Sequence, residues 1–160
     1  MNQQMTKSTK ISEIKRMWHL VDAKGLVLGR VSSMIATLLM GKGKSYFLRN
    51  LDCGDYVVVT NVKDVKVTGR KELLKKYYTY SGYPGGLRIE ALGDLQARKP
   101  DMVIYHAVSG MLPQNKLRDR MLKRLHLFVG EEHDYKDKFK IQKSKLQTKS
   151  KKFKFYDKRY

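Results

Sequence analysis

The sequence predicts an α/β fold, because it places a strand, a helix and a second strand one after another in its first half. Residues 18–21 form a short apolar segment that ends at the turn signal Asp22–Gly25. Between Leu28 and Met40 the apolar residues recur at the spacing of one helix face, and Gly41 is a natural helix stop. Residues 56–60 form a continuous β-branched run, typical of a strand buried on both faces. Such a unit makes a parallel strand pair with a right-handed crossover.

The rest of the chain alternates short predicted elements with glycine- and proline-rich breaks. Ser81–Gly86 is the richest of these breaks and is expected to form an irregular loop. We expect a further short strand over 64–69, helices over 90–97, 100–108 and 115–125, and a final strand over 127–129. Together these elements form one globular domain over 17–133, with a polar N-terminal extension over 1–16 and a lysine-rich C-terminal extension over 134–160.

The charge of the chain points to a polyanionic partner. Lysine and arginine number 34 against 15 aspartates and glutamates, for a formal net charge of +19. A fold does not require this excess, and repulsion among so many like charges destabilises the compact state. Residues 134–160 hold 11 cationic and 3 acidic residues, a charge of +8, which leaves +11 for the preceding 133 residues. A basic body with a basic tail predicts a protein embedded in nucleic acid.

Several other classes of protein are disfavoured by the residue content. Cys53 is the only cysteine, so no intrachain disulfide can form and a reducing compartment is expected. No metal site is expected, because metal-ligand spacings are missing among the histidines, which are His19, His106, His126 and His133. No apolar run approaches the roughly 18–20 residues that span a bilayer, and residues 1–17 do not resemble a secretory signal. No Ser/His/Asp set or carboxylate pair indicates catalysis.

The segment Gly41–Ser45 superficially resembles a phosphate-binding P-loop, because it contains Gly-Lys-Ser. The full pattern requires a glycine where Leu38 stands, and a P-loop precedes its helix, whereas this segment follows one. Nucleotide binding is therefore disfavoured, and no cofactor is expected. Two interpretations remain for this segment: a basic turn that touches RNA phosphates through Lys42 and Lys44, or a solvated loop.

Two further segments are candidates for RNA contact. In residues 75–86, lysines can neutralise phosphates, tyrosines can stack on splayed bases, and glycines let the backbone approach a ligand. The alternative is that every second tyrosine packs in the core. The predicted helix over 115–125 carries more cations than solubility requires, although an ordinary solvated face is its alternative. The candidate RNA-binding residues are Arg30, Lys42, Lys44, Arg49, Arg70, Lys71, Lys75, Lys76, Tyr77, Tyr78, Tyr80, Tyr83, Lys116, Arg118, Arg120, Lys123, Arg124, Lys151, Lys152 and Lys154.

A series of short sequence motifs follows the order and spacing found in a known family. The motifs are Val21–Ala23, Leu28–Arg30, Gly54–Val59, Val67–Lys71, Lys76–Tyr78, Ser81–Leu87, Ala97–Pro100, Gly110–Pro113 and Gly130–His133. Because of these motifs, the stretch from Trp18 to Glu132 resembles the thirteenth protein of the large ribosomal subunit, in its bacterial or organellar form. The sequence departs from the family over 46–55 and 114–120, where local contacts and the start of the helix are expected to differ.

The resemblance implies both a fold and a role. The implied fold is a three-layer α/β/α arrangement with a small, mostly parallel sheet of about four strands, to which the basic extensions are added. The implied role is structural and not enzymatic: binding to large-subunit rRNA and early participation in subunit assembly, on a ribosome of the cytoplasm or of an organelle. The implied partners are rRNA and neighbouring large-subunit proteins, without a membrane, a small-molecule substrate or a second copy of the chain. The rival functions are an RNA-acting enzyme and a free RNA-binding regulator.

Overall fold

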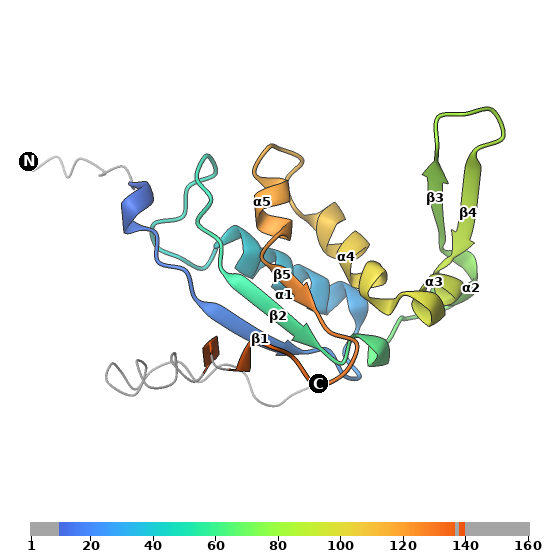
Figure 1. The fold of residues 1–160 in the computed structure, drawn as a ribbon, viewed down its shortest axis with the longest axis horizontal. Coiled ribbons are helices and arrows are strands. Elements are labelled where there is room, and N and C mark those ends of the chain that lie inside the picture. The colour runs from blue at the N-terminus through green and yellow to red at the C-terminus, as the bar shows by residue number, and fades with distance from the viewer. Residues whose placement is uncertain (1–9, 137, 140–160) are drawn as a thin grey trace, which may run out of the picture.

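The computed structural model describes residues 10–136, 138 and 139, and it confirms the predicted α/β class. Strand β1 (Trp18–Asp22), helix α1 (Leu28–Met40) and strand β2 (Tyr56–Thr60) form the expected βαβ unit. β1 runs parallel to β2, with Trp18 opposite Tyr56, and β5 (Leu125–Leu127) lies parallel on the other edge of β2. The result is a three-stranded parallel sheet in the order β1-β2-β5 (Figure 1).

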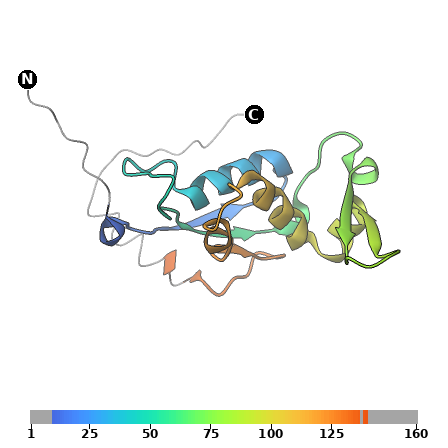
Figure 2. The same ribbon diagram turned by 90° about the horizontal axis from the view of Figure 1, so that it is seen from above.

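One face of this sheet carries the hydrophobic core. Val57 and Val59 of β2 have no exposed surface and point to this face. Helix α1 covers them with a stripe of buried apolar side chains at helical spacing, as its sequence predicts. Helix α4 (Pro100–Met111) packs alongside α1 and adds Val103, Ile104 and Val108 to the same core. Both helices therefore lie on the same side of the sheet (Figure 2).

The opposite face of the sheet is covered by aromatic rings. Trp18 stacks on Tyr56, with ring centroids 4.4 Å apart, and lies 5.8 Å from the ring of His126. Tyr135 lies 5.0 Å from Trp18 and Phe139 lies 6.3 Å from it, so the segment that follows β5 closes this face (Figure 2). Both covering residues belong to the stretch that the sequence assigns to the C-terminal extension.

A second sheet, which the sequence analysis missed, is separate from the first. Strands β3 (Lys76–Tyr80) and β4 (Leu87–Ala91) pair in an antiparallel hairpin that projects from one end of the molecule, beside α2 (Lys71–Leu74) and α3 (Leu92–Arg98) (Figure 1). The tyrosine-rich segment is therefore a strand, and the predicted irregular loop is the connection at its tip. The helix expected over 90–97 begins only at Leu92, because Glu90 and Ala91 belong to β4.

Other boundaries also differ from the prediction. The strand expected over 64–69 is reduced to a single bridge between Val27 and Lys66, after the 3-10 turn η2 (Val62–Asp64). The helix expected over 115–125 is the shorter α5 (Arg118–Leu122), since Leu125 already belongs to β5. The N-terminal segment contains the 3-10 turn η1 (Ile11–Glu13). The described part of the chain contains no helix long and apolar enough to cross a membrane.

Candidate nucleic-acid interface

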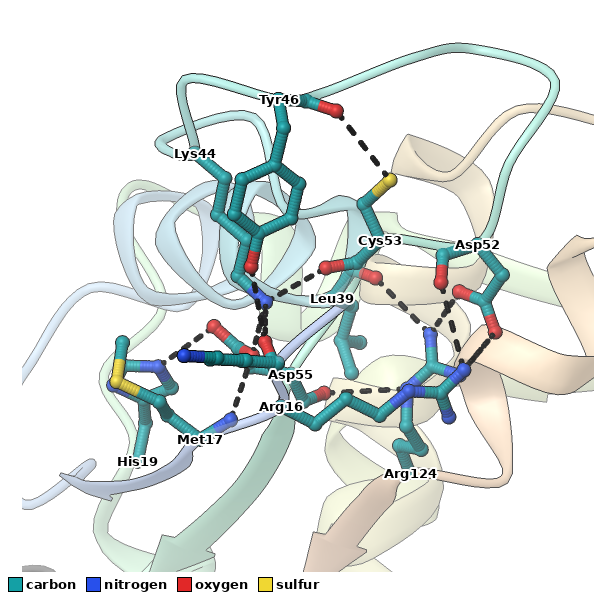
Figure 3. Close-up of polar contacts among 11 residues, drawn as sticks. Arg16, Met17, His19, Leu39, Lys44, Tyr46, Asp52, Cys53, Asp55 and Arg124 are labelled. Carbon is teal, nitrogen blue, oxygen red and sulfur yellow. Dashed lines mark hydrogen bonds and ion pairs between the residues drawn. The ribbon is translucent and has the colours of Figure 1, made fainter. Parts of the chain in front are cut away.

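Arg124, one of the predicted RNA-binding cations, lies inside the protein. Only 4% of the surface of Arg124 is exposed to solvent. Both terminal nitrogens of its guanidinium donate to the carboxylate of Asp52 (Figure 3). Nη2 also donates to the carbonyl of Leu39 at 3.3 Å, and Nε donates to the carbonyl of Asp55 at 3.3 Å. The positive charge is therefore satisfied by protein acceptors from two segments, the end of α1 and the loop before β2.

Lys44, a second predicted cation, is held in the same region. Its Nζ donates to the carboxylate of Asp55 at 2.5 Å and to the carbonyl of Cys53 at 2.8 Å (Figure 3). It also donates to the carbonyl of Lys15 at 2.8 Å. An ammonium group has three donors, and all three are used. The interpretation of Gly41–Ser45 as a solvated loop is therefore too simple, because the side chain of Lys44 turns inward.

Asp55 is the acceptor at the centre of this network. It also accepts a hydrogen bond from the backbone N–H of Met17 at 2.8 Å and lies 3.1 Å from Nε2 of His19. Burial alone would raise the pKa of this carboxyl, but hydrogen bonds from His19, Lys44 and Met17, with the charge of Lys44, hold the pKa below its ordinary value. Asp55 is therefore a buried carboxylate that stays ionised.

The end of helix α1 explains why these charges meet. Gly41 ends the helix in the left-handed conformation, with φ of 76°. The turn lets the chain return against α1, where the Cα of Gly54 packs so closely that a Cβ would lie 1.7 Å from the carbonyl oxygen of Leu39. The last carbonyls of α1 then accept hydrogen bonds from Arg124 and from the backbone N–H of Asp55. A cation at this end also complements the helix dipole.

Most of the other predicted cations are exposed. The exposed residues are Arg30, Lys42, Arg49, Arg70, Lys71, Lys75, Lys76, Lys116, Arg120 and Lys123. Arg118 is half-buried and donates to the hydroxyl of Ser109. Lys151, Lys152 and Lys154 lie outside the described residues. The exposed cations can neutralise phosphates, whereas Lys44 and Arg124 are already paired within the protein.

Two hollows each bring together exposed cations that are separated along the chain. The larger, with a volume of about 550 Å³, is lined by Arg120 of α5, by Lys123, which follows α5, and by Arg16, whose guanidinium lies 3.4 Å from the carboxylate of Asp52. Arg16 precedes β1 in the predicted N-terminal extension, and the sequence analysis missed it because nothing in the local pattern distinguishes it. The smaller hollow, of about 360 Å³, brings Lys42 and Arg49 together across the loop that follows α1.

The tyrosines of the hairpin divide by strand alternation. Tyr77 points toward the body of the protein, where its ring lies 5.3 Å from that of His106 and the Nζ of Lys75 lies 5.1 Å from its centroid. Tyr78, Tyr80 and Tyr83 are 66%, 65% and 76% exposed. One tyrosine of this segment therefore packs against the protein and three are exposed, and RNA contact by the exposed rings stays a prediction.

The histidines and acidic residues do not form a metal centre in the part of the chain that the structure describes. No group of three or more His, Cys, Asp or Glu side chains converges among residues 10–136, 138 and 139. The ring of His126 lies against the rings of Trp18 and Tyr135, and burial lowers the pKa of His126. Its role is to fill the second face of the sheet.

The chain is similar to ribosomal proteins over most of its length. The family described as "Ribosomal protein L13" matches residues 16–134. The "Large ribosomal subunit protein uL13" of Dehalococcoides mccartyi (strain ATCC BAA-2266 / KCTC 15142 / 195) is 55% identical over 130 residues, which cover 81% of this chain and 91% of the relative. The protein of the same name from Dictyoglomus thermophilum is 50% identical, covering 79% and 89%. The one from Thermobifida fusca is 48% identical, covering 81% and 87%.

Proposed function

Because this chain belongs to the ribosomal protein L13 family, we propose that it is a structural component of the large ribosomal subunit and binds the rRNA of that subunit. The single observation that carries the proposal is the family match over residues 16–134. Membership confirms the resemblance noted in the sequence, in its bacterial form. It also confirms the expectation that the chain is not an enzyme, since the family is one of structural ribosomal proteins.

The physical basis of the proposed binding is electrostatic. RNA condenses counterions along its backbone, and a protein that places cations on the phosphates releases them. A net charge of +19 and the exposed cations on α1, α2, the hairpin and α5 support this mode. Contacts to phosphates position the protein on the folded rRNA without reading its sequence.

The proposed interface consists of the exposed cations and tyrosines. Arg16, Arg120 and Lys123 line one hollow, and Lys42 and Arg49 line another, so each hollow is suited to an rRNA backbone segment. The lysines of the C-terminal extension are proposed to add further phosphate contacts. Lys44 and Arg124 are proposed to contribute indirectly, by holding the loop 46–55 in place.

The partners and the location follow from the same proposal. Neighbouring large-subunit proteins are the expected protein contacts, and the expected location is the ribosome in the cytoplasm. We also propose that the chain joins the subunit early in assembly, because a protein that holds several rRNA segments together acts before those segments are fixed by others. The proposed organisation is a globular RNA-binding domain with basic extensions at both ends.

Sedimentation of the native protein in a cell extract tests this function. Comigration with large ribosomal subunits, resistant to moderate salt and lost after ribonuclease treatment, is the expected result. Comigration with other RNA, or sedimentation as a free protein under all conditions, would contradict the proposal and favour a free RNA-binding regulator.

A further inference from the structure

The β3–β4 hairpin has two unlike faces. The inner face carries Tyr77, which packs on His106, and Glu90, whose carboxylate accepts hydrogen bonds from Arg98 at 2.8–3.1 Å. The outer face carries Tyr78 and Tyr80 together with the residues opposite them on β4. The pairing places Ile89 opposite Tyr78 and Leu87 opposite Tyr80. Both aliphatic residues are 54% exposed, so the outer face has a continuous aromatic and aliphatic surface open to solvent.

This surface is built to hold its rings in place. Directly opposed side chains on one face of an antiparallel pair contact each other, so each tyrosine is braced by an aliphatic partner. The inner face is fixed to α4 through Tyr77 and His106, which leaves the outer face as the free side of the sheet. A two-stranded hairpin is marginally stable alone, and exposed apolar patches of this kind mark interaction sites.

The charges around the outer face favour a polyanion. The residues of β3 and β4 that share this face include Lys76 and no carboxylate, because Glu90 alternates to the inner face and is paired there with Arg98. Lys75 stands next to Lys76 at the base of the hairpin. A ligand with flat apolar faces and a negative backbone satisfies both the rings and the lysine, and RNA has both properties.

The spacing of the rings indicates the state of that RNA. Side chains two positions apart on a strand lie about 6.6 Å apart, about twice the ~3.4 Å between neighbouring bases along one strand of duplex DNA, and bases in duplex RNA are stacked as closely. Bases stacked on both tyrosines therefore cannot stay stacked on each other as in a helix. Duplex RNA also hides its base faces, whereas loops and bulges expose them.

We propose that the outer face of the β3–β4 hairpin binds unpaired RNA nucleotides, with splayed bases stacked on Tyr78 and Tyr80 and a phosphate at Lys76. This rests on the proposed rRNA-binding function and adds to it a class of ligand: a loop, bulge or single-stranded segment. The hairpin reads an exposed base face, while the cations elsewhere bind backbone phosphates. Tyr77 positions the hairpin and does not touch the RNA.

Binding of the full chain to two RNA probes tests the proposal. The probes are a 12-nucleotide oligouridylate, which is unstructured, and a blunt 12-base-pair RNA duplex. The double variant Tyr78→Ala/Tyr80→Ala is expected to bind oligouridylate about 5- to 150-fold more weakly for each base that loses its stack. Its affinity for the duplex is expected to change less than about twofold, since phosphate contacts dominate there.

Three control variants separate stacking from other effects. Tyr78→Phe/Tyr80→Phe keeps the rings and is expected to retain oligouridylate binding. Leu73→Ala removes a side chain that is 79% exposed on α2 and is expected to change neither affinity. Lys76→Ala is expected to reduce the salt dependence of oligouridylate binding, whereas the double alanine variant leaves that dependence unchanged, because a stacked ring releases no counterions.

Two outcomes of the binding experiment overturn the proposal. Unchanged oligouridylate affinity in the double alanine variant would exclude stacking, and if the same variant failed to enter ribosomal subunits, the face would dock a protein instead. An equal loss on both probes would point to a general RNA contact without base stacking. Failure of the wild-type protein to sediment with large subunits would contradict the proposed function itself, which the oligouridylate comparison does not test.

Discussion

The positive charge of Arg124 is buried and paired within the protein. A buried guanidinium is tolerated only where acceptors satisfy its donors, and here Asp52 and the carbonyls of Leu39 and Asp55 do so. Because these acceptors come from α1 and from the loop before β2, the side chain joins the end of α1 to the segment between α5 and β5 (Figure 3). Removing one partner of such a pair leaves an uncompensated buried charge.

Replacing Arg124 therefore tests the buried pair. Arg124→Met is expected to lower the free energy of unfolding by about 3–5 kcal/mol, since Asp52 would lose the guanidinium that pairs with both of its oxygens and would keep only Arg16, at 3.4 Å. The matched control is Arg120→Met, which removes the same charge from an exposed position of α5 and is expected to change stability by no more than about 0.5 kcal/mol. Urea denaturation measures the free energy of unfolding of each variant, and equal losses for the two would show that the pair with Asp52 does not contribute to stability.

Asp55 predicts a specific dependence of stability on pH. Its pKa in the folded protein lies below the ordinary value of 3.8, so the unfolded state binds protons more readily and the ionised form stabilises the fold. This contribution is complete above pH 4 and is lost as the pH falls through the lower, folded-state pKa. The difference in unfolding free energy between the wild type and Asp55→Asn is therefore expected to shrink below pH 4. A difference that stays constant from pH 6 to pH 2 would contradict this.

At the scale of elements, α1 and the loop 46–55 form one unit. The helix places Val31, Ile35 and Leu39 against the sheet, and its last turn receives the backbone of Gly54 at a distance that excludes any side chain. The same contact brings Asp52 and Asp55 beneath the end of the helix. The buried charges therefore depend on a backbone approach that only glycine permits.

A pair of glycine substitutions checks this dependence. Gly54→Ala is expected to destabilise the protein by at least about 1–3 kcal/mol, because the new Cβ would meet the backbone oxygen of Leu39. Gly110→Ala adds the same methyl group in the last turn of α4, where nothing lies within 4 Å, and is expected to stabilise by about 0.5–1 kcal/mol. Thermal unfolding measures the melting temperatures of both variants. If the contact is as described, the melting temperature falls for Gly54→Ala and rises for Gly110→Ala, whereas shifts in the same direction would contradict it.

At the scale of the whole molecule, the excess of positive charge is the basis of the proposed binding to RNA. Cations are distributed over both ends of the sheet, the hairpin and the C-terminal extension. Within that extension the charge is uneven: residues 134–139 contain two lysines and two aspartates, whereas residues 140–160 contain nine cationic residues and one aspartate. The stretch with no net charge is the one that contains Tyr135 and Phe139.

Salt is the direct test of the electrostatic mode. A protein that contacts about 6–10 phosphates loses on the order of 10³–10⁵ in affinity between 50 and 200 mM salt. The full chain is expected to show a loss of this size for structured RNA in a filter-binding titration. Affinity that stays level over that range would exclude a mode dominated by phosphate contacts.

Two truncations separate binding from folding in the C-terminal extension. Removing 140–160 is expected to weaken RNA binding and to leave the melting temperature unchanged. Removing 134–160 is expected to weaken binding equally, since no further net charge is lost, but to lower the melting temperature by several degrees, because Tyr135 and Phe139 no longer cover Trp18. Equal melting temperatures for the two would place the end of the folded domain at 133, as the sequence predicts.

The sequence by itself determined the α/β class, the parallel βαβ unit and the excess of positive charge on which the proposed binding to rRNA rests. Each depends on local periodicity or on composition, and both can be recognised within a short window. The β3–β4 hairpin escaped notice because its connection, Ser81–Gly86, is longer than the two-residue turns that mark hairpins most clearly.

Only the tertiary structure decided which charged and aromatic residues are available to a partner. Lys44 and Lys42 are alike in sequence, yet one is paired inside the protein and the other is exposed. Arg124 is buried because Asp52, 72 positions away in the chain, returns beneath the end of α1. Such pairing depends on contacts between segments that are distant in the chain. The residues adjacent to a cation therefore do not reveal whether a carboxylate pairs with it in the folded protein.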